Sequence, residues 1–442
     1  MLIGIIIGVV IIIAIIAATL FYLPSVRNPS SSQQTVQSSQ LKTIQIGVLL
    51  PLTGSEASVG LQFEQVLKYA QNQANQLLQQ LGSNIRIQLL FEDTGLSPQR
   101  ALQAVQDLYS RGVKLIIGPL TSGELRQIKQ FTDQNNMLVI SPSSTAPDLA
   151  IANDSIFRDV SNDTYQGYAI ANIMYEQGIR VAVIIWRGDS FGDGLVKVVN
   201  STFTRLGGKV VLAVRYDPST TDFSSYVSTL NSIVQSLASQ YPLKSIAVYS
   251  ISFDELADIM QLASQYPLLS NISWYNTGVP GSPVILQNPI AANFAIKVKL
   301  LVTIAAPVHT IYTDELNKAL NASLYADAYR IYDSFWLYVY SILKVGSDDT
   351  SKIKQILPII GAHFFGASGI HIFDKFGDRV SGIYDLLIVN KTSSGYEWSV
   401  YGVYDTTNKK ISLGVPPPLS PPPGYLVPND PNALVKLQSI SA

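Results

Sequence analysis

The stretch between residues 137 and 167 gathers candidate ligand-binding groups in one place. An apolar run from Met137 to Ile140 leads into a loop of serines and threonines that is interrupted by Pro142 and Pro147. Hydroxyl groups donate and accept hydrogen bonds, and the carboxyl ends of buried strands are where α/β proteins place their ligands. The pattern therefore predicts that this loop holds a small polar molecule.

No pattern typical of catalysis accompanies this loop. The three histidines (His309, His363 and His371) are scattered, and there is no H-E-x-x-H, G-x-S-x-G, Walker or G-x-G-x-x-G motif. Cysteine is absent, which excludes thiol chemistry, disulfides and Cys-ligated metals. We interpret GDSFGDG (188–194) as a strand–helix turn and FDKFGD (373–378) as a hairpin turn rather than a calcium loop. We expect no enzymatic activity, no cofactor and no metal.

The length and the charge of the chain limit its domain organisation and its class of partner. The chain has 442 residues, enough for two globular lobes with appendages. Charged residues make up 14% of the chain and the net charge is -1. Because nucleic-acid binding relies on a basic surface, we exclude that class of partner.

The N-terminal region predicts a membrane attachment. Residues 2–23 carry no charged side chain, and a helix of that length rises about 33 Å, enough to cross a bilayer. Its length and the lack of a basic front favour an uncleaved signal anchor over a cleavable signal peptide. Residues 24–42 are rich in Ser and Gln and predict a flexible stalk.

Six Asn-x-Ser/Thr sequons place the globular part outside the cytoplasm in this interpretation. They lie at Asn153, Asn162, Asn200, Asn271, Asn321 and Asn390. Together with the anchor they favour a single-pass protein of the cell membrane, with an extracytoplasmic domain that could be glycosylated.

Downstream of the stalk, short apolar strands alternate with amphipathic helices. This pattern is typical of an α/β protein with doubly wound parallel sheets covered on both faces. The predicted strands are 44–50, 85–93, 114–119, 137–140, 180–186, 209–216 and 245–250. The predicted helices are 61–81, 98–112, 122–134, 192–206, 223–238, 254–265 and 324–345.

Three features near the C-terminus complete the expected organisation. The stripe Tyr325, Tyr329, Tyr332, Trp336 and Tyr340 has helical spacing and predicts a core-facing surface. A hairpin is expected over residues 370–389, with its turn at FGD. The Pro-rich end, residues 406–442, is expected to be extended and exposed, as a spacer or, alternatively, a docking segment for a partner.

Three blocks of sequence resemble the branched-chain amino acid group of type I periplasmic-binding proteins, which serve ABC transporters. They are IQIGVLLPLTGSEASVGLQ (44–62), GPLTSGE (118–124) with SPSSTAPDL (141–149), and the segments DAYRIYDSFWLYVYSILKVGSDD and FDKFGDRVSGIYDLLIV (327–389). The resemblance implies two doubly wound lobes joined by a three-crossing hinge. Lobe one would comprise 43–162 and 300–373, and lobe two 163–299 and 374–405.

The resemblance also implies where a ligand carboxylate would bind. It assigns Thr121 and Ser122 in one loop, and Ser143 and Thr145 in the next, as its hydrogen-bonding partners. Ser122 stands where a helix begins, so that free N–H groups and the helix dipole would favour an anion. The alternatives are that Ser122 is a plain N-cap and that Ser143 and Thr145 only stabilise their loop.

For the ligand ammonium, the resemblance assigns Asp163, which precedes Gln166 and Gly167 as the family pattern requires. The alternative is an acid that caps a helix. Asn162 is a sequon, and a glycan there would crowd the ligand, so either that sequon is unused or Asp163 lies elsewhere.

In lobe two the sequence departs from the family pattern. Phe191 and Phe253 match the expected aromatic positions. A carboxylate expected near WYNTGVPG (274–281) is missing, and Asn276 or Thr277 stands there instead. This leaves amides, urea-like compounds and small organic acids open as ligands beside amino acids.

The leading hypothesis is a membrane-tethered solute-binding protein that closes on a small polar ligand and delivers it to ABC permease subunits. A ligand-sensing ectodomain is the alternative, because the same fold serves both functions. An enzyme remains only a fallback, since no nucleophile–base pair is visible.

Overall fold

The structure is a computed structural model that describes residues 41–54, 56–278, 282–305, 309–322, 324–380, 383–406, 409–413 and 417–441. The predicted anchor (2–23) and nearly all of the predicted stalk lie outside these ranges. Among the helices that the structure does describe, none combines the length and the apolar character needed to cross a bilayer.

The first lobe is built on a five-stranded sheet in the order β2-β1-β3-β4-β5, and every neighbouring pair is parallel. Its strands are β1 (Lys42–Leu50), β2 (Ile85–Asp93), β3 (Leu115–Ile117), β4 (Leu138–Ser141) and β5 (Ile156–Arg158). The strand order reverses direction between β1 and β3. Ligands of open α/β sheets bind beside such a switch point, at the carboxyl ends of the strands.

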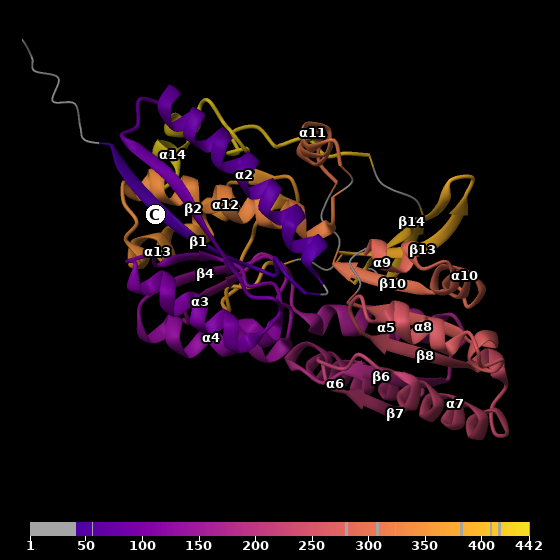
Figure 1. The fold of residues 1–442 in the computed structure, drawn as a ribbon. Helices are drawn as coiled ribbons and strands as arrows, with labels where there is room; N and C mark the ends of the chain where they lie inside the picture. Colours follow the sequence, from indigo (N-terminus) through magenta and orange to yellow (C-terminus); the bar gives the residue numbers. More distant parts are fainter. Residues whose placement is uncertain are drawn as a thin grey trace, which may run out of the picture. The chain divides into compact units, whose positions relative to one another are not determined.

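Helices cover both faces of this sheet, as the alternation of strands and helices predicts (Figure 1). The helices are α2 (Ala57–Gln80), α3 (Pro98–Ser110), α4 (Ser122–Gln134), α12 (Ala326–Val345) and α13 (Thr350–Ala362). In β1, Ile46 and Val48 pack with α2 and α12, whereas Leu49 packs with α3 and α4. The period-2 geometry of a strand produces this division.

The second lobe is built on an eight-stranded sheet in the order β15-β14-β13-β10-β9-β8-β6-β7. Its strands are β6 (Val181–Arg187), β7 (Lys209–Tyr216), β8 (Ile246–Ile251), β9 (Ser273–Thr277), β10 (Leu301–Ala305), β13 (Ile383–Thr392), β14 (Gly395–Asp405) and β15 (Lys410–Leu413). The strands β6 to β10 are parallel, and β13 to β15 are antiparallel additions. Because β10 belongs to this sheet, residues 301–305 lie in the second lobe, whereas the predicted division assigned residues from 300 onward to the first.

This sheet too is covered on both faces. Its helices are α5 (Asp163–Glu176), α6 (Ser190–Arg205), α7 (Ser224–Ala238), α8 (Leu256–Ala263), α9 (Pro283–Gln287) and α10 (Pro289–Lys297). One face packs on α7, α8 and α10, and the other on α5 and α6. The expected α/β architecture of two sheets with helical layers is therefore confirmed for the described part of the chain.

The chain passes between the lobes after β5, after β10 and after β12 (Gly369–Ile370), which pairs with β11 (Phe365–Gly366). The expected hairpin over residues 370–389 is confirmed only beside its turn, where Phe373 and Arg379 form an antiparallel bridge and the Val380 amide donates to the Ile372 carbonyl at 2.8 Å. A turn is present, with the Gly377 amide donating to the Asp374 carbonyl at 3.0 Å. However, β13 pairs with β14 rather than with the segment before the turn. A turn signal fixes a local reversal but not the partner of the strand that follows it.

The aromatic stripe of α12 is confirmed as core for Tyr332, Trp336 and Tyr340, which are buried in the first lobe. The C-terminal segment differs from the expected exposed tail. Leu426 and the short helix α14 (Ala433–Ser439) pack into the same core. The chain therefore returns to the first lobe after β15. Prolines prevent regular structure, but they do not prevent the apolar residues between them from being buried.

Candidate functional site

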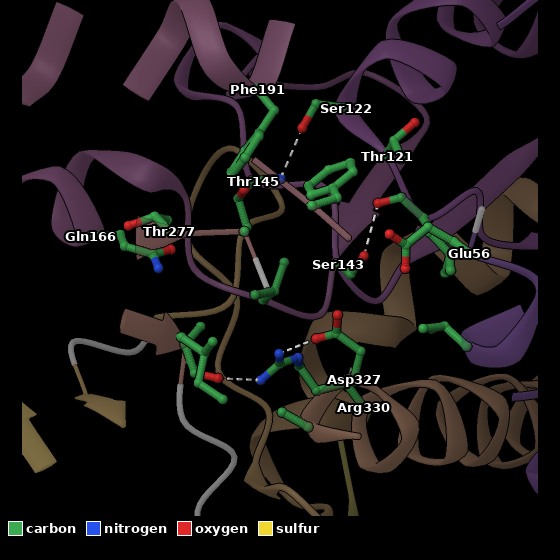
Figure 2. Close-up of a pocket in the computed structure, with 18 of the residues that line it drawn as sticks. Glu56, Thr121, Ser122, Ser143, Thr145, Gln166, Phe191, Thr277, Asp327 and Arg330 are labelled. Carbon is green, nitrogen blue, oxygen red and sulfur yellow. Dashed lines mark hydrogen bonds and ion pairs between the residues drawn. The ribbon is translucent and has the colours of Figure 1, made fainter. Parts of the chain in front are cut away.

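A cavity of about 110 Å³ is lined by residues of both lobes (Figure 2). Most of the predicted site residues contribute to its wall: Thr121, Ser122, Ser143, Thr145, Phe191, Phe253 and Thr277. The two remaining predicted residues, Asp163 and Asn276, are buried outside that lining. The hydroxyl loops of lobe one and the aromatic residues of lobe two thus meet at one hollow.

The N-terminus of α4 contributes the first polar wall. Thr121, and not Ser122, is the N-cap residue. Thr121 Oγ1 accepts from the Glu124 amide at 3.3 Å, and the Thr121 amide donates to Glu124 Oε2 at 3.1 Å, a reciprocal capping box. The Thr121 hydroxyl also donates to Glu124 Oε2, at 2.6 Å. Burial raises the pKa of Glu124. The amides of Ser122 and Gly123 have no partner within the helix, so their positive ends are available for an anion.

The loop after β4 contributes the second polar wall, and it is tied to the first. Ser122 Oγ accepts hydrogen bonds from the amides of Thr145 and Ala146, both at 3.1 Å, and Ser143 Oγ donates to the Leu120 carbonyl at 2.8 Å (Figure 2). These hydroxyls therefore stabilise the loops and also line the cavity. Ser122 Oγ accepts two hydrogen bonds and keeps its O–H for a ligand, whereas Ser143 Oγ has given its only hydrogen to Leu120 and keeps acceptor lone pairs. Both serines stabilise the loops, and only Ser122 can also donate to a carboxylate.

Asp163 stands behind Thr145. Its Oδ2 accepts a hydrogen bond from the Thr145 hydroxyl at 2.8 Å, and its Oδ1 has no partner among the described residues. Burial raises the pKa of Asp163 to about 7, and the positive charge of Arg158 opposes that shift. Because the side chain is fully buried outside the lining, the direct contact with a ligand ammonium that the resemblance implied lacks a geometric basis here.

The N-cap of α5 is Asn162, whose Oδ1 accepts from the Thr164 amide at 3.0 Å. Its Nδ2 donates to Asp378 Oδ2 at 3.1 Å. A glycan on Asn162 would be attached to this same nitrogen, beside Asp378.

Two aromatic rings form the wall from lobe two. Phe191 and Phe253 stack with ring centroids 5.4 Å apart and an interplanar angle of 28°. The guanidinium of Arg187 lies 3.8 Å from the Phe253 ring centroid on that residue's π face. The pair offers a flat apolar surface to a ligand.

The strand β9 decides between Asn276 and Thr277. Successive strand residues point to opposite faces, and it is Thr277 that lines the cavity. The Asn276 amide is buried and donates to the Ser250 carbonyl at 3.1 Å and to Ser252 Oγ at 3.0 Å. Its role is structural, and it does not replace the missing carboxylate.

Sequence reasoning missed several polar groups in the wall. Arg330 of α12 donates to the Pro142 carbonyl at 3.2 Å and the Ala305 carbonyl at 2.9 Å, and it forms an ion pair with Asp327. It thereby joins the hydroxyl loop to the end of β10. The i,i+3 spacing of Asp327 and Arg330 within the third resembling block was a signal that could have identified them.

Glu56 is the other missed group. It lines the cavity, is 7% exposed, and is the N-cap residue of α2, although its side chain makes no capping bond. Its Oε1 accepts a hydrogen bond from the Asp254 amide of lobe two at 3.3 Å. Burial, together with the negative charges of Asp254 and Glu255, raises the pKa of Glu56 to about 8.

Comparisons with known proteins agree with this geometry. Residues 62–392 match the family described as "Receptor family ligand binding region". An uncharacterized protein of Methanocaldococcus jannaschii is 29% identical over 86% of this chain and 93% of its own length. A Leu/Ile/Val-binding protein homolog of Brucella melitensis is 29% identical over 43% of this chain, and the match spans about half (51%) of that relative.

Solved structures share the fold. A leucine-binding protein of Thermotoga maritima superposes with a TM-score of 0.65 at 21% identity, covering 83% of this chain and 99% of that one. A solute-binding protein of R. palustris in complex with benzoate has a TM-score of 0.66 at 16% identity, covering 84% and 98%. The family match spans most of the chain, and the chain belongs to the type I periplasmic-binding-protein family, a family of ligand-binding proteins rather than enzymes.

Proposed function

We propose that this protein captures a small carboxylate-bearing molecule between its lobes, in first place a branched-chain or similar amino acid, and delivers it to an ABC importer. The observation that carries the proposal is the cavity wall where the first turn of α4 meets Ser122, Ser143 and Thr145. This wall offers the unpaired first-turn N–H groups of α4 and the O–H of Ser122 as donors.

A carboxylate suits this wall for a physical reason. Hydrogen bonds to a charged group contribute roughly 1.5–3 kcal/mol each, about twice the contribution of neutral ones. The helix dipole adds to the attraction within the first turn of α4. The bonds from Ser143 to Leu120 and from Thr145 to Asp163 already hold the loop after β4 in place, so little ordering of the backbone is needed on binding.

The rest of the wall suits an apolar side chain. Val59, Leu96 and Leu120 come from lobe one, and Ile304 and the stacked rings of Phe191 and Phe253 come from lobe two. A ligand that is polar at one end and apolar at the other would contact both lobes. The Leu/Ile/Val-binding relatives and the leucine-binding neighbour support an amino acid as that ligand.

Aromatic acids are the second candidate class. The stacked pair Phe191 and Phe253 offers a ring surface, and aromatic groups favour offset stacking on such a surface. Solved neighbours in complex with benzoate and with 4-hydroxybenzoate support this alternative. Amides and urea-like compounds would use the hydroxyl wall without its charge preference.

Delivery to a permease would follow from closure. A ligand that contacts both lobes only in the closed arrangement shifts the population toward it. The anchor expected at residues 2–23 would hold the domain at the extracytoplasmic face of the cell membrane beside the permease subunits. A ligand-sensing ectodomain would use the same closure but a different partner, and co-purification with permease subunits rather than a kinase would distinguish the two.

Calorimetry and thermal unfolding test the ligand class. The panel comprises leucine, isoleucine, valine, benzoate, 4-hydroxybenzoate, acetamide and urea. We expect a saturable heat and a raised Tm with amino acids. Mass spectrometry of small molecules retained by the purified full chain provides an independent readout. No heat and no Tm shift with any carboxylate would contradict the proposal.

A further inference from the structure

Glu56 places a carboxyl group in the cavity, and a role in helix capping does not explain this group. N-cap positions favour Ser, Thr, Asp and Asn, whose short side chains reach the first-turn amides. Glu56 occupies the N-cap of α2 without forming such a bond. Its carboxyl group instead faces the same hollow as Ser143 and Arg330 (Figure 2).

Among the described residues, Glu56 also forms no ion pair, and its hydrogen bond comes from the neutral amide of Asp254. A carboxyl group that is 7% exposed is costly to ionise without a cation. Such a group in a binding cavity is suited to a positively charged ligand.

We propose that Glu56 is the anionic partner of a ligand ammonium group, so that the ligand is a free amino acid rather than a simple aliphatic or aromatic acid. This inference rests on the proposed function, because it assumes that the ligand carboxylate lies against the hydroxyl wall. Both groups line one cavity of about 110 Å³. An amino acid whose carboxylate lies against Ser122 and the first turn of α4 would place its ammonium in the hollow that Glu56 faces.

The other acids near the cavity are either paired with a cation or buried outside its lining. Asp327 is paired with Arg330, and Asp163 lies behind Thr145, from which it accepts a hydrogen bond. Asp254 presents its backbone amide to Glu56 and is itself outside the lining. Glu56 thus has the geometry that the resemblance led us to seek in Asp163 and near residues 274–281.

The charges around Glu56 predict a proton linkage. Asp254 and Glu255 face it from the loop that leads into α8, with Arg187 of β6 opposing them, and Tyr325 and the Asp327–Arg330 pair lie on the side of α12. Asp254 and Glu255 raise the pKa of Glu56, and Arg187 lowers it less than burial raises it. A bound ammonium favours the ionised carboxylate, so binding must release a proton near neutral pH.

Matched ligand pairs test the assignment directly. Calorimetry of the full chain compares leucine with 4-methylpentanoate, and phenylalanine with 3-phenylpropanoate, which differ by the ammonium group. We expect the amino acid of at least one pair to bind at least tenfold more tightly than its deaminated analogue. Glu56→Gln should weaken the amino acid at least tenfold and leave the analogue unchanged or tighter. Glu64→Gln, on the same helix, is the control and should change neither.

The pH dependence provides a second readout. Below the raised pKa of Glu56, amino acid affinity should rise with pH, by about tenfold or more between pH 6 and pH 8. The apparent binding enthalpy should vary with the ionisation enthalpy of the buffer, and this variation should vanish in Glu56→Gln. Glu56→Asp keeps the carboxyl group and should retain this dependence on the buffer. Retention would also show that the position tolerates substitution.

The two proposals fail in different ways. If neither member of any pair binds the wild-type protein, the carboxylate-binding function is overturned. If the deaminated acids bind the wild-type protein as tightly as the amino acids, or Glu56→Gln binds amino acids with unchanged affinity and unchanged proton release, only the role of Glu56 is overturned.

Discussion

Thr145 and Asp163 connect the ligand loop of lobe one to the first helix of lobe two through a hydrogen bond of 2.8 Å between Oγ1 and Oδ2. Thr145 lines the cavity, whereas Asp163 is fully buried. The backbone follows the same route, since the Asp163 amide donates to the Thr145 carbonyl at 2.8 Å. The segment that leads from β5 into α5 therefore holds the Thr145 hydroxyl in its position at the cavity.

Thr145→Val removes the hydroxyl with little change in volume. We expect a loss of stability of about 1–3 kcal/mol, because the Asp163 carboxyl group loses the hydrogen bond from Thr145 while it stays buried. Ligand affinity should fall at least tenfold. Urea unfolding and calorimetry measure the two effects, and Thr145→Ser, which keeps the hydroxyl, should restore most of both. Unchanged stability and affinity in Thr145→Val would contradict this coupling.

The raised pKa of Asp163 predicts a pH dependence of stability. Its folded pKa is about 7, above the ordinary value of 3.8, so the folded state holds its proton more tightly than the unfolded state. The favourable contribution is complete below about pH 4 and is lost as pH rises through about 7. Relative to wild type, Asp163→Asn should gain stability over this window, by roughly a few kcal/mol.

Urea unfolding of the wild type and of Asp163→Asn at intervals from pH 4 to pH 8 measures this difference. Asp107→Asn serves as the control, because Asp107 is an exposed acid on α3. A difference between wild type and Asp163→Asn that does not change with pH would contradict the assignment.

The C-terminal segment should stabilise lobe one. Leu437 of α14 is 3% exposed in the core of that lobe, whereas Val435 of the same helix is 70% exposed. We expect Leu437→Ala to cost about 2–5 kcal/mol and Val435→Ala to change stability within about 0.5 kcal/mol. Thermal unfolding measures both, and equal effects of the two substitutions would show that α14 does not pack as described.

Lys344 fixes the end of the same segment. Lys344 stands in the last turn of α12, and its Nζ donates to the carbonyls of Leu437 and Ile440, each at 2.8 Å. Lys344→Met keeps the apolar stem and removes these bonds. We expect a loss of about 1.5–3 kcal/mol for hydrogen bonds from a charged donor. The measurement is the midpoint of urea unfolding, with the exposed Lys352→Met as control.

Arg126 should favour the closed arrangement of the lobes. It donates to Ser190 Oγ of lobe two and forms an ion pair with Asp148 of lobe one. Because its side chain is 46% exposed, Arg126→Ala should change stability by no more than about 1 kcal/mol. Ligand affinity, which depends on closure, should nevertheless fall by roughly two- to fivefold.

Arg111→Ala is the matched control for Arg126→Ala. Arg111 is also 46% exposed and pairs with Glu92, but both of these residues belong to lobe one. Calorimetry should show unchanged ligand affinity for Arg111→Ala. Equal losses of affinity in the two variants would argue against a role of Arg126 in closure.

Much of the fold was predictable from the sequence because its signals are local. The alternation of apolar strands with amphipathic helices requires covered sheets, and the segment from Met137 to Thr145 predicts hydroxyls at the carboxyl end of a strand. Parallel sheets bring such ends to one edge. The family resemblance assigned Thr121, Ser122, Ser143 and Thr145 to the site, and their gathering at one cavity agrees with this geometry.

Only the tertiary structure shows which of two neighbouring residues faces the cavity and which residues distant in sequence contact each other. Asn276 and Thr277 are neighbours, yet the facing of β9 sends only Thr277 to the cavity. Asp163 lies behind Thr145, while Glu56 and Arg330 reach the cavity from α2 and α12. The burial of Leu426 and Leu437 depends on a surface offered by lobe one. Local propensity carries no information about such partners, because only the folded chain brings them together.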